Sequence, residues 1–200
     1  MLKIKKKPKI VLFGAGGHAA SCIQILETLK TYKIIFLIDK KIKNNFNFYQ
    51  VKKEQSDYRL YKKYANNALI AIGHTKDNKI RKIIFNRLKE NKFIIPKVIS
   101  KHSTVAKNSQ IGEGTIVMDG VRINSGVKIG KNCIINTNSI IEHGTEIGDN
   151  CHIAPGAILN GDIKIHSDTF VGSGSIIKEK VTIPQNTFIK MGSVIKRNPQ

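Results

Sequence analysis

The second half of the chain carries a hydrophobic pattern with a period of six residues. An aliphatic residue occupies every sixth position from Val105 to Ile195, sixteen positions in succession. The fourth residue after each of them is often small or β-branched. An α-helix repeats every 3.6 residues and a long strand every two, so neither element explains this spacing. Short strands joined by tight corners do explain it, because each flat side then points one aliphatic side chain inward.

This period predicts a parallel β-helix, in which each coil buries the apolar faces of its neighbours. Gly and Asn in the repeats supply the unusual backbone angles that the corners need. The pattern resembles that of left-handed β-helix acyltransferases, in which three hexads form a triangular coil of eighteen residues. The resemblance implies five coils over residues 105–194. Cys133 and Cys151 would then stack in the interior, as small fillers rather than redox groups.

The first half of the chain has the pattern of a small α/β unit. Residues 9–13 predict a short buried strand, and an apolar-periodic stretch through about Leu29 predicts a helix. Between them lies the segment Gly14-Ala15-Gly16-Gly17-His18-Ala19. Strand, glycine loop and helix form the context in which glycines let the backbone approach a phosphate. The helix N-terminus offers N–H donors to the same group.

A second strand is predicted at residues 34–38, and it ends at Asp39, 25 residues after Gly14. An acidic residue near that distance contacts the ribose in dinucleotide-binding units. Further predictions are a strand at residues 68–72, a helix at 76–91, a short strand at 93–95 and a polar loop over 40–61.

The sequence thus predicts two domains. Residues 1–98 are expected to form a Rossmann-like nucleotide-binding domain with parallel strands. Residues 99–200 are expected to form a left-handed β-helix, for which the resemblance to β-helix acyltransferases implies an acyltransferase domain. The first is short for a complete dinucleotide-binding domain. Joined to a β-helix, its glycine loop indicates a smaller ligand that carries a nucleotide.

Charge divides the chain in the same way. The net charge is +20, of which residues 1–104 carry +18, and 29 of the 34 basic residues are lysine. Specific nucleic-acid readers use arginine for bidentate contacts, so we expect a solvated lysine surface and no specific nucleic-acid partner. A role in attracting an anionic substrate is the alternative.

We expect a cytoplasmic protein without a membrane partner. No apolar run reaches the length of a membrane span, and the apolar run near the N-terminus is too short for a signal peptide. Three cysteines also exclude a disulfide scaffold.

The order of the two domains resembles one family of acyltransferases closely. This family contains UDP-4-amino-sugar N-acetyltransferases (PglD-like) and sialic acid O-acetyltransferases (NeuD-like). The motifs that carry the resemblance are residues 14–18, 36–39, 70–73, 136–143 and 147–157. It implies an acetyl-CoA-dependent N-acetyltransferase that acts on the amino group of a UDP-linked amino sugar, in bacterial surface-glycan or glycoprotein sugar biosynthesis. The alternative is O-acetylation of sialic acid or a related surface sugar. The family works as a homotrimer with the cofactor between neighbouring β-helices.

The resemblance also implies roles for individual residues. His143 matches the catalytic base, and Glu142 beside it is a further catalytic candidate. The pKa of a free histidine lies near neutrality, which suits a residue that accepts a proton from an attacking amine or hydroxyl. The residues that match acetyl-CoA contacts are His152, Ser173 and Met191. Those that match sugar-nucleotide contacts are Gly16, Gly17, His18, Asp39, Lys40 and Gly73.

Two departures from the family pattern stand out. The family carries Asp or Glu directly after the catalytic histidine, whereas this chain has Gly144 there. Glu142 or Glu146 could replace that acid, and the sequence does not decide between them. The family often ends in a Gly-x-Pro-Ala-type segment, whereas this chain ends in residues 196–200, Lys-Arg-Asn-Pro-Gln.

Two other classes of protein fit less well. Gamma carbonic anhydrases share the β-helix but need three histidines on one zinc ion. His143 and His152 are nine residues apart and no His-x4-His spacing occurs, so we expect no metal. A scaffold or nucleic-acid binder would use the basic first half, but it would not explain the motifs around His143 and His152.

Overall fold

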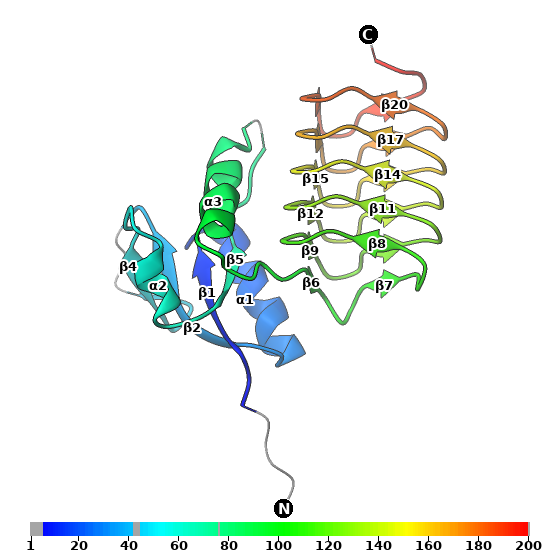
Figure 1. Ribbon diagram of the computed structural model, residues 1–200. Helices are drawn as coiled ribbons and strands as arrows, with labels where there is room; N and C mark the ends of the chain where they lie inside the picture. Colours follow the sequence, from blue (N-terminus) through cyan, green and yellow to red (C-terminus); the bar gives the residue numbers. More distant parts are fainter. Residues whose placement is uncertain (1–5, 42–44, 76, 200) are drawn as a thin grey trace, which may run out of the picture. The chain divides into compact units, whose positions relative to one another are not determined.

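The computed structural model describes residues 6–41, 45–75 and 77–199, which form two compact units (Figure 1). The first unit contains the described residues up to Gly73 together with residues 83–96. The second unit contains the described residues within 74–82 and 97–200. Segment 74–82 therefore clusters with the β-helix, although it precedes it by fifteen residues in sequence.

The first unit is built on a five-stranded sheet with the order β3-β4-β2-β1-β5. Its strands are β1 Lys9–Phe13, β2 Lys33–Asp39, β3 Asn45–Phe46, β4 Tyr49–Lys53 and β5 Asn67–Ile70. The helices of the described chain are α1 Gly17–Leu29, α2 Arg59–Lys62 and α3 Lys79–Glu90. Strand β1 lies parallel between β2 and β5, so the carboxyl ends of these three strands share one edge of the sheet.

The prediction of a polar loop over residues 40–61 is wrong for the residues of this segment that the structure describes. Strands β3 and β4 form an antiparallel hairpin there, β4 extends the sheet beside β2, and α2 follows. Among the residues of β4, Val51 alone is fully buried, because the hairpin lies at the sheet edge and exposes its polar residues. The short strand predicted at residues 93–95 is reduced to a single bridge between Ile94 and Asn67.

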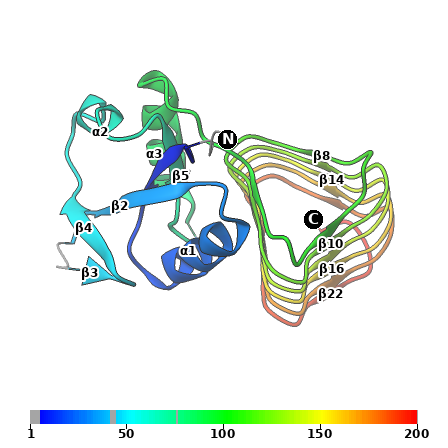
Figure 2. The same cartoon turned by 90° about the horizontal axis from the view of Figure 1, so that it is seen from below.

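The second unit is a left-handed parallel β-helix of two-residue strands, which confirms the predicted fold class. The strands are β6 Val98–Ile99, β7 Thr104–Val105, β8 Gln110–Ile111, β9 Ile116–Val117, β10 Arg122–Ile123, β11 Lys128–Ile129, β12 Ile134–Ile135, β13 Ile140–Ile141, β14 Glu146–Ile147, β15 His152–Ile153, β16 Ile158–Leu159, β17 Lys164–Ile165, β18 Phe170–Val171, β19 Ile176–Ile177, β20 Thr182–Ile183, β21 Phe188–Ile189 and β22 Val194–Ile195. Each of the sixteen periodic aliphatic residues is the second residue of its strand. Every third strand pairs in parallel, which gives three sheets and the triangular cross-section of Figure 2.

From residue 113 onward, two-residue turns at the three edges of the triangle form three columns of corners. The His143 column contains residues 125–126, 143–144, 161–162 and 179–180. The Asn132 column contains 113–114, 131–132, 149–150, 167–168 and 185–186, and the Ser173 column contains 119–120, 137–138, 155–156, 173–174 and 191–192. The second residue of each pair in these columns has a left-handed backbone, as Asn132 at φ 55° and Gly144 at φ 66° illustrate. Gly and Asn at these positions relieve the strain that other side chains would meet.

The interior of the β-helix is filled by aliphatic and small side chains. Cys133 and Cys151 are fully buried and carry free thiols. The Cys133 side chain and burial raise the pKa of the Cys151 thiol. Both residues therefore serve as small interior fillers, as the sequence predicts. No helix in the described parts of the chain is long and apolar enough to cross a membrane.

Candidate active site

The glycine loop lies at the carboxyl edge of the first sheet. It connects the end of β1 to the first residue of α1, Gly17. Asp39, at the end of β2, holds this loop in place: its Oδ2 accepts a hydrogen bond from the Ala15 N–H at 2.8 Å. Its Oδ1 accepts another from the Lys41 N–H at 3.0 Å. The carboxylate thus fixes the loop at the edge where parallel sheets bind ligands.

The glycines of this loop differ in what requires them. Gly14 has a φ of +116°, and a Cβ there would lie 2.6 Å from Ile72 Cγ1 and 2.7 Å from the Ala71 carbonyl oxygen. The fold therefore demands glycine at position 14. At Gly16 and Gly17, in contrast, a Cβ would meet no atom within 4 Å. Packing within the chain gives no reason for these two glycines, whereas close approach of a ligand to the backbone would.

Five of the six predicted sugar-nucleotide residues gather at this edge. Gly73 lies against His18, because a Cβ on Gly73 would stand 3.3 Å from the Cβ of His18. Gly16 and Gly17 begin the adjoining helix, and Asp39 contacts the same loop. The sixth residue, Lys40, is exposed directly after β2.

His143 projects from a corner of the β-helix, and its side chain is 65% exposed. Its ring lies over Gly161 of the next coil: a Cβ on Gly161 would be 2.5 Å from His143 Cε1 and 2.7 Å from Nε2. The ring Nδ1 lies 3.9 Å from Oδ1 of Asp162. An exposed imidazole on a rigid coil can accept a proton from a substrate that reaches this corner.

The two glutamates considered from the sequence have other partners. Glu142 Oε2 accepts a hydrogen bond from Asn124 Nδ2 at 2.6 Å. Glu146 pairs with Lys128 Nζ at 2.8 Å, and this hydrogen bond lowers the pKa of Glu146. The carboxylate beside the imidazole belongs instead to Asp162, which the sequence reasoning missed. The signal was present, because Asp162 follows Gly144 by one coil of eighteen residues.

His152 lies on β15, and little of its surface is exposed. Its Nδ1 is 2.6 Å from the His74 carbonyl oxygen, and its Nε2 is 3.0 Å from Asn136 Nδ2. Burial lowers the pKa of His152 to about 4 and that of His74 to about 3. The neutral ring therefore donates from Nδ1 and accepts at Nε2. It ties segment 74–82 to the β-helix, and its predicted contact with acetyl-CoA stays a prediction.

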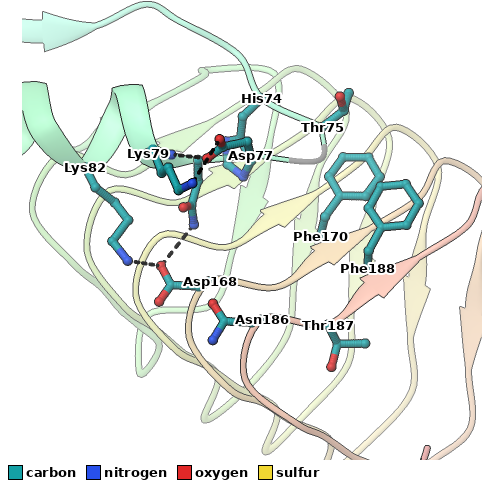
Figure 3. A pocket seen from close by; sticks show the side chains of 11 residues that line it. His74, Thr75, Asp77, Lys79, Lys82, Asp168, Phe170, Asn186, Thr187 and Phe188 are labelled. Carbon is teal, nitrogen blue, oxygen red and sulfur yellow. Dashed lines mark hydrogen bonds and ion pairs between the residues drawn. The ribbon is translucent and has the colours of Figure 1, made fainter.

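A cavity of about 350 Å³ opens between segment 74–82 and the sheet that contains β18 and β21 (Figure 3). Phe170 and Phe188 stack at one side of it, with ring centroids 5.1 Å apart. Asp168 forms the polar side, where it accepts a hydrogen bond from Asn78 at 2.9 Å and pairs with Lys82 at 2.8 Å. The sequence reasoning assigned no role to these residues, since the pairs join positions up to 90 residues apart.

Ser173 and Met191 lie one above the other in the Ser173 column, where the Gly192 N–H donates to the Ser173 carbonyl oxygen at 2.8 Å. Met191 is 79% exposed. This column and the His143 column stand at different corners of the triangle, because their turns are not a multiple of eighteen residues apart. A single β-helix therefore keeps the predicted base and these two predicted cofactor residues a full flat side apart. Within residues 6–41, 45–75 and 77–199, no three histidine, cysteine or acidic side chains gather as a metal site would require.

Comparisons with known proteins agree with the two-part fold. Residues 9–88 match the PglD N-terminal domain, and residues 126–161 match the bacterial transferase hexapeptide repeats.

Solved structures resemble the chain over almost its whole length. Perosamine N-acetyltransferase from Caulobacter crescentus, with a histidine replaced by asparagine and in complex with CoA and GDP-perosamine, is 26% identical. The match covers 95% of this chain and 89% of that one, with a TM-score of 0.89. The acetyltransferase domain of PglB from Neisseria gonorrhoeae FA1090, in complex with acetyl coenzyme A, is 25% identical, with coverage of 96% and 93% and a TM-score of 0.86. WeeI from Acinetobacter baumannii AYE, 24% identical with coverage of 96% and 93% and a TM-score of 0.84, shares the fold.

The PglD N-terminal domain, the hexapeptide coils and the similarity to CoA-bound acetyltransferases indicate an acetyltransferase of the β-helix class. Within this class, the chain is similar to sugar N-acetyltransferases such as perosamine N-acetyltransferase, and it carries a PglD N-terminal domain before its hexapeptide repeats. The family resemblance inferred from the sequence is thereby confirmed.

Proposed function

We propose that this chain transfers the acetyl group of acetyl-CoA to the amino group of a nucleotide-activated amino sugar, with His143 as the general base. The observation that carries the proposal is the exposed His143 imidazole, held over Gly161 on a rigid corner. Similarity to an enzyme crystallised with CoA and GDP-perosamine, and to a domain crystallised with acetyl coenzyme A, supports the two substrates. A UDP-linked 4-amino sugar of bacterial surface-glycan or glycoprotein biosynthesis is the acceptor we propose, in the cytoplasm.

In this proposal, the glycine loop binds the nucleotide part of the acceptor. Gly16 and Gly17 leave space for a phosphate at the start of α1, and Asp39 keeps the loop in its observed conformation. His18, Lys40 and Gly73 complete the proposed contacts.

The chemistry at His143 follows from its position. As the amine nitrogen bonds to the acetyl carbon, it must lose a proton, and the unprotonated His143 ring accepts it. The carbon–sulfur bond then breaks, and the proton returned from the imidazolium leaves with CoA as the thiol. Backbone N–H groups at the corners are the proposed donors to the oxygen that gains negative charge.

The separation of the corner columns supports a homotrimer. Ser173 and Met191 stand at a different corner from His143, so a complete site needs the Ser173 column of one copy beside the His143 column of another. His152 is the third proposed cofactor contact. Light scattering should give a mass of three chains per particle. A monomer that catalyses the reaction at the full rate would contradict this arrangement.

The function is tested by measuring thiol release from acetyl-CoA. The acceptors are UDP-linked and GDP-linked 4-amino sugars and sialic acids, and each is assayed with the wild type and with His143→Ala. We expect turnover with an amino-sugar nucleotide and a loss of about a hundred-fold or more in His143→Ala. Turnover with sialic acid alone would replace the proposal by O-acetylation. Equal rates in the two proteins would exclude His143 as the base.

A further inference from the structure

A carboxylate lies beside the proposed base, although it does not come from the expected position. We propose that Asp162, from the next coil of the β-helix, is the positioning residue that orients the His143 imidazole and stabilises its protonated form. The inference rests on the proposed function of His143.

The geometry at the corner places the two groups within reach of one another. Asp162 Oδ1 lies 3.9 Å from His143 Nδ1, which is ion-pair distance and slightly beyond a direct hydrogen bond. The two side chains are 65% and 51% exposed, so a small rotation of either one is free to close the gap. Hydrogen bonds of catalytic groups are commonly longer without substrate than with it.

Glycine at position 144 leaves room for the Asp162 carboxylate beside the corner. A Cβ on Gly144 would lie 2.1 Å from Asp162 Oδ1, which no pair of unbonded atoms tolerates. The carboxylate of Asp162 therefore occupies the space that a side chain at position 144 would need. The family resemblance implies an acid at position 144, where this chain has glycine. In this chain, the Asp162 carboxylate leaves no room for a side chain at position 144. The acid of this corner comes from position 162 instead.

The other charged groups around the corner have partners or lie further along the column. Glu142 accepts from Asn124, and Glu146 pairs with Lys128. On the following coil, Glu179 pairs with Lys178 at 3.8 Å, and the backbone of Lys180 donates to Gly161.

Asp162 lies nearest to the Nδ1 side of the His143 ring, and this position determines the role of Asp162. A carboxylate near Nδ1 favours the tautomer that carries its proton on Nδ1, which leaves Nε2 to accept the proton of the attacking amine. Once the ring is protonated, the negative charge of Asp162 stabilises it. Asp162 needs no contact with either substrate for this role.

The test compares steady-state rates and pH profiles of five proteins. These are the wild type, Asp162→Asn, Asp162→Glu, the double variant Gly144→Asp/Asp162→Gly, and the control Glu179→Gln, which removes an acid from the same column one coil further on. We expect Asp162→Asn to lower kcat about ten-fold, with KM for both substrates within about two-fold. The dependence of its kcat on pH should also differ from that of the wild type.

Rescue distinguishes this role from a structural one. Asp162→Glu should recover part of kcat, and the double variant should recover kcat and the pH profile, because it returns a carboxylate to the same space. Aspartate tolerates the left-handed backbone at position 144. Glu179→Gln should behave as the wild type. An Asp162→Asn protein with the wild-type kcat and pH profile overturns the inference, as does a loss confined to KM.

Failure of the proposed function would look different. In that case the wild type turns over no acceptor, or His143→Ala is as active as the wild type. The inference is then tested without substrate, by following the His143 ring protons by NMR as the pH is varied. A transition at lower pH in Asp162→Asn than in the wild type supports the interaction, and identical transitions overturn it.

Discussion

Gly161→Ala should displace the His143 ring while leaving the β-helix intact. The three atoms nearest to a Cβ at this position all belong to the His143 imidazole, the closest at 2.5 Å. Unbonded carbon atoms normally stand about 3.5 Å apart, so the ring must move by about 1 Å. It is the end of an exposed side chain and can yield. The backbone of Gly161 does not have a positive φ, so alanine can adopt the same conformation.

The expected effects on activity and on stability differ widely. A side chain forced away from its preferred rotamer costs about 1 kcal/mol, and an exposed histidine can relieve most of this by rotating. The free energy of unfolding should therefore fall by less than about 1 kcal/mol. A displacement of about 1 Å in a reacting group, in contrast, lowers the rate by about a hundred-fold.

The matched control is Gly126→Ala, in the same column two coils before Gly161 and one coil before His143. Gly126 has a φ of +73°, and a Cβ there would have the Gly144 nitrogen at 3.9 Å as its nearest atom. The left-handed backbone should cost this variant about 1–2 kcal/mol of stability, while the imidazole stays in place. Gly126→Ala should thus be the less stable and more active of the two variants. Thermal unfolding and thiol release from acetyl-CoA measure both quantities. Wild-type kcat/KM in Gly161→Ala would refute the reasoning.

Two further predictions concern the glycine loop and the buried histidine. Gly17→Ala should keep the unfolding temperature and raise KM for the sugar nucleotide about ten-fold. Gly14→Ala should lower the unfolding temperature, because alanine there has both a strained φ and a steric clash. An unchanged KM in Gly17→Ala would count against a phosphate at this loop. The pKa of His152 is about 4 in the folded protein and near 6.5 in the unfolded chain. Its contribution to the free energy of unfolding is therefore fully present above pH 6.5 and is lost as the pH falls toward 4. Between pH 7 and pH 4.5, urea unfolding at fixed protein concentration should therefore show a smaller loss of stability in His152→Asn than in the wild type, by about 2 kcal/mol. Equal losses would show that His152 remains accessible to protons in the fold.

The β-helix could be predicted from sequence because one constraint recurs in every hexad. Each coil must point an aliphatic side chain inward on each flat side, so the period survives variation at any single corner. The structure adds one strand to the predicted series, Val98–Ile99, whose second residue continues the same period of six. The glycine loop was also predictable, since strand, loop and helix are contiguous in sequence.

The elements that escaped prediction depend on contacts between distant residues. Tyr61 is buried and accepts a hydrogen bond from the Gln55 N–H at 2.6 Å, so it fixes a segment whose own pattern is polar. Segment 74–82 is held in the same way. Arg81 is buried and donates to Asn132 Oδ1 at 2.9 Å, across 51 residues. No local periodicity encodes such pairs, because the partner side chains occur once and not in a repeat.

Asp162 belongs to neither of these groups, because the repeat itself encodes its position. Read along the chain, Gly144 stands where the family resemblance implies an acid beside the proposed base. Read along the axis of the β-helix, position 144 has position 162 as its neighbour on the next coil, and the backbone N–H of Asp162 donates to the His143 carbonyl oxygen at 2.9 Å. A side chain missing from one coil can thus be supplied from the adjacent coil at a spacing of eighteen residues. A comparison of contiguous residues alone therefore misses part of a catalytic motif in a β-helix. Each candidate position should be compared together with the two positions that lie eighteen residues before it and eighteen residues after it.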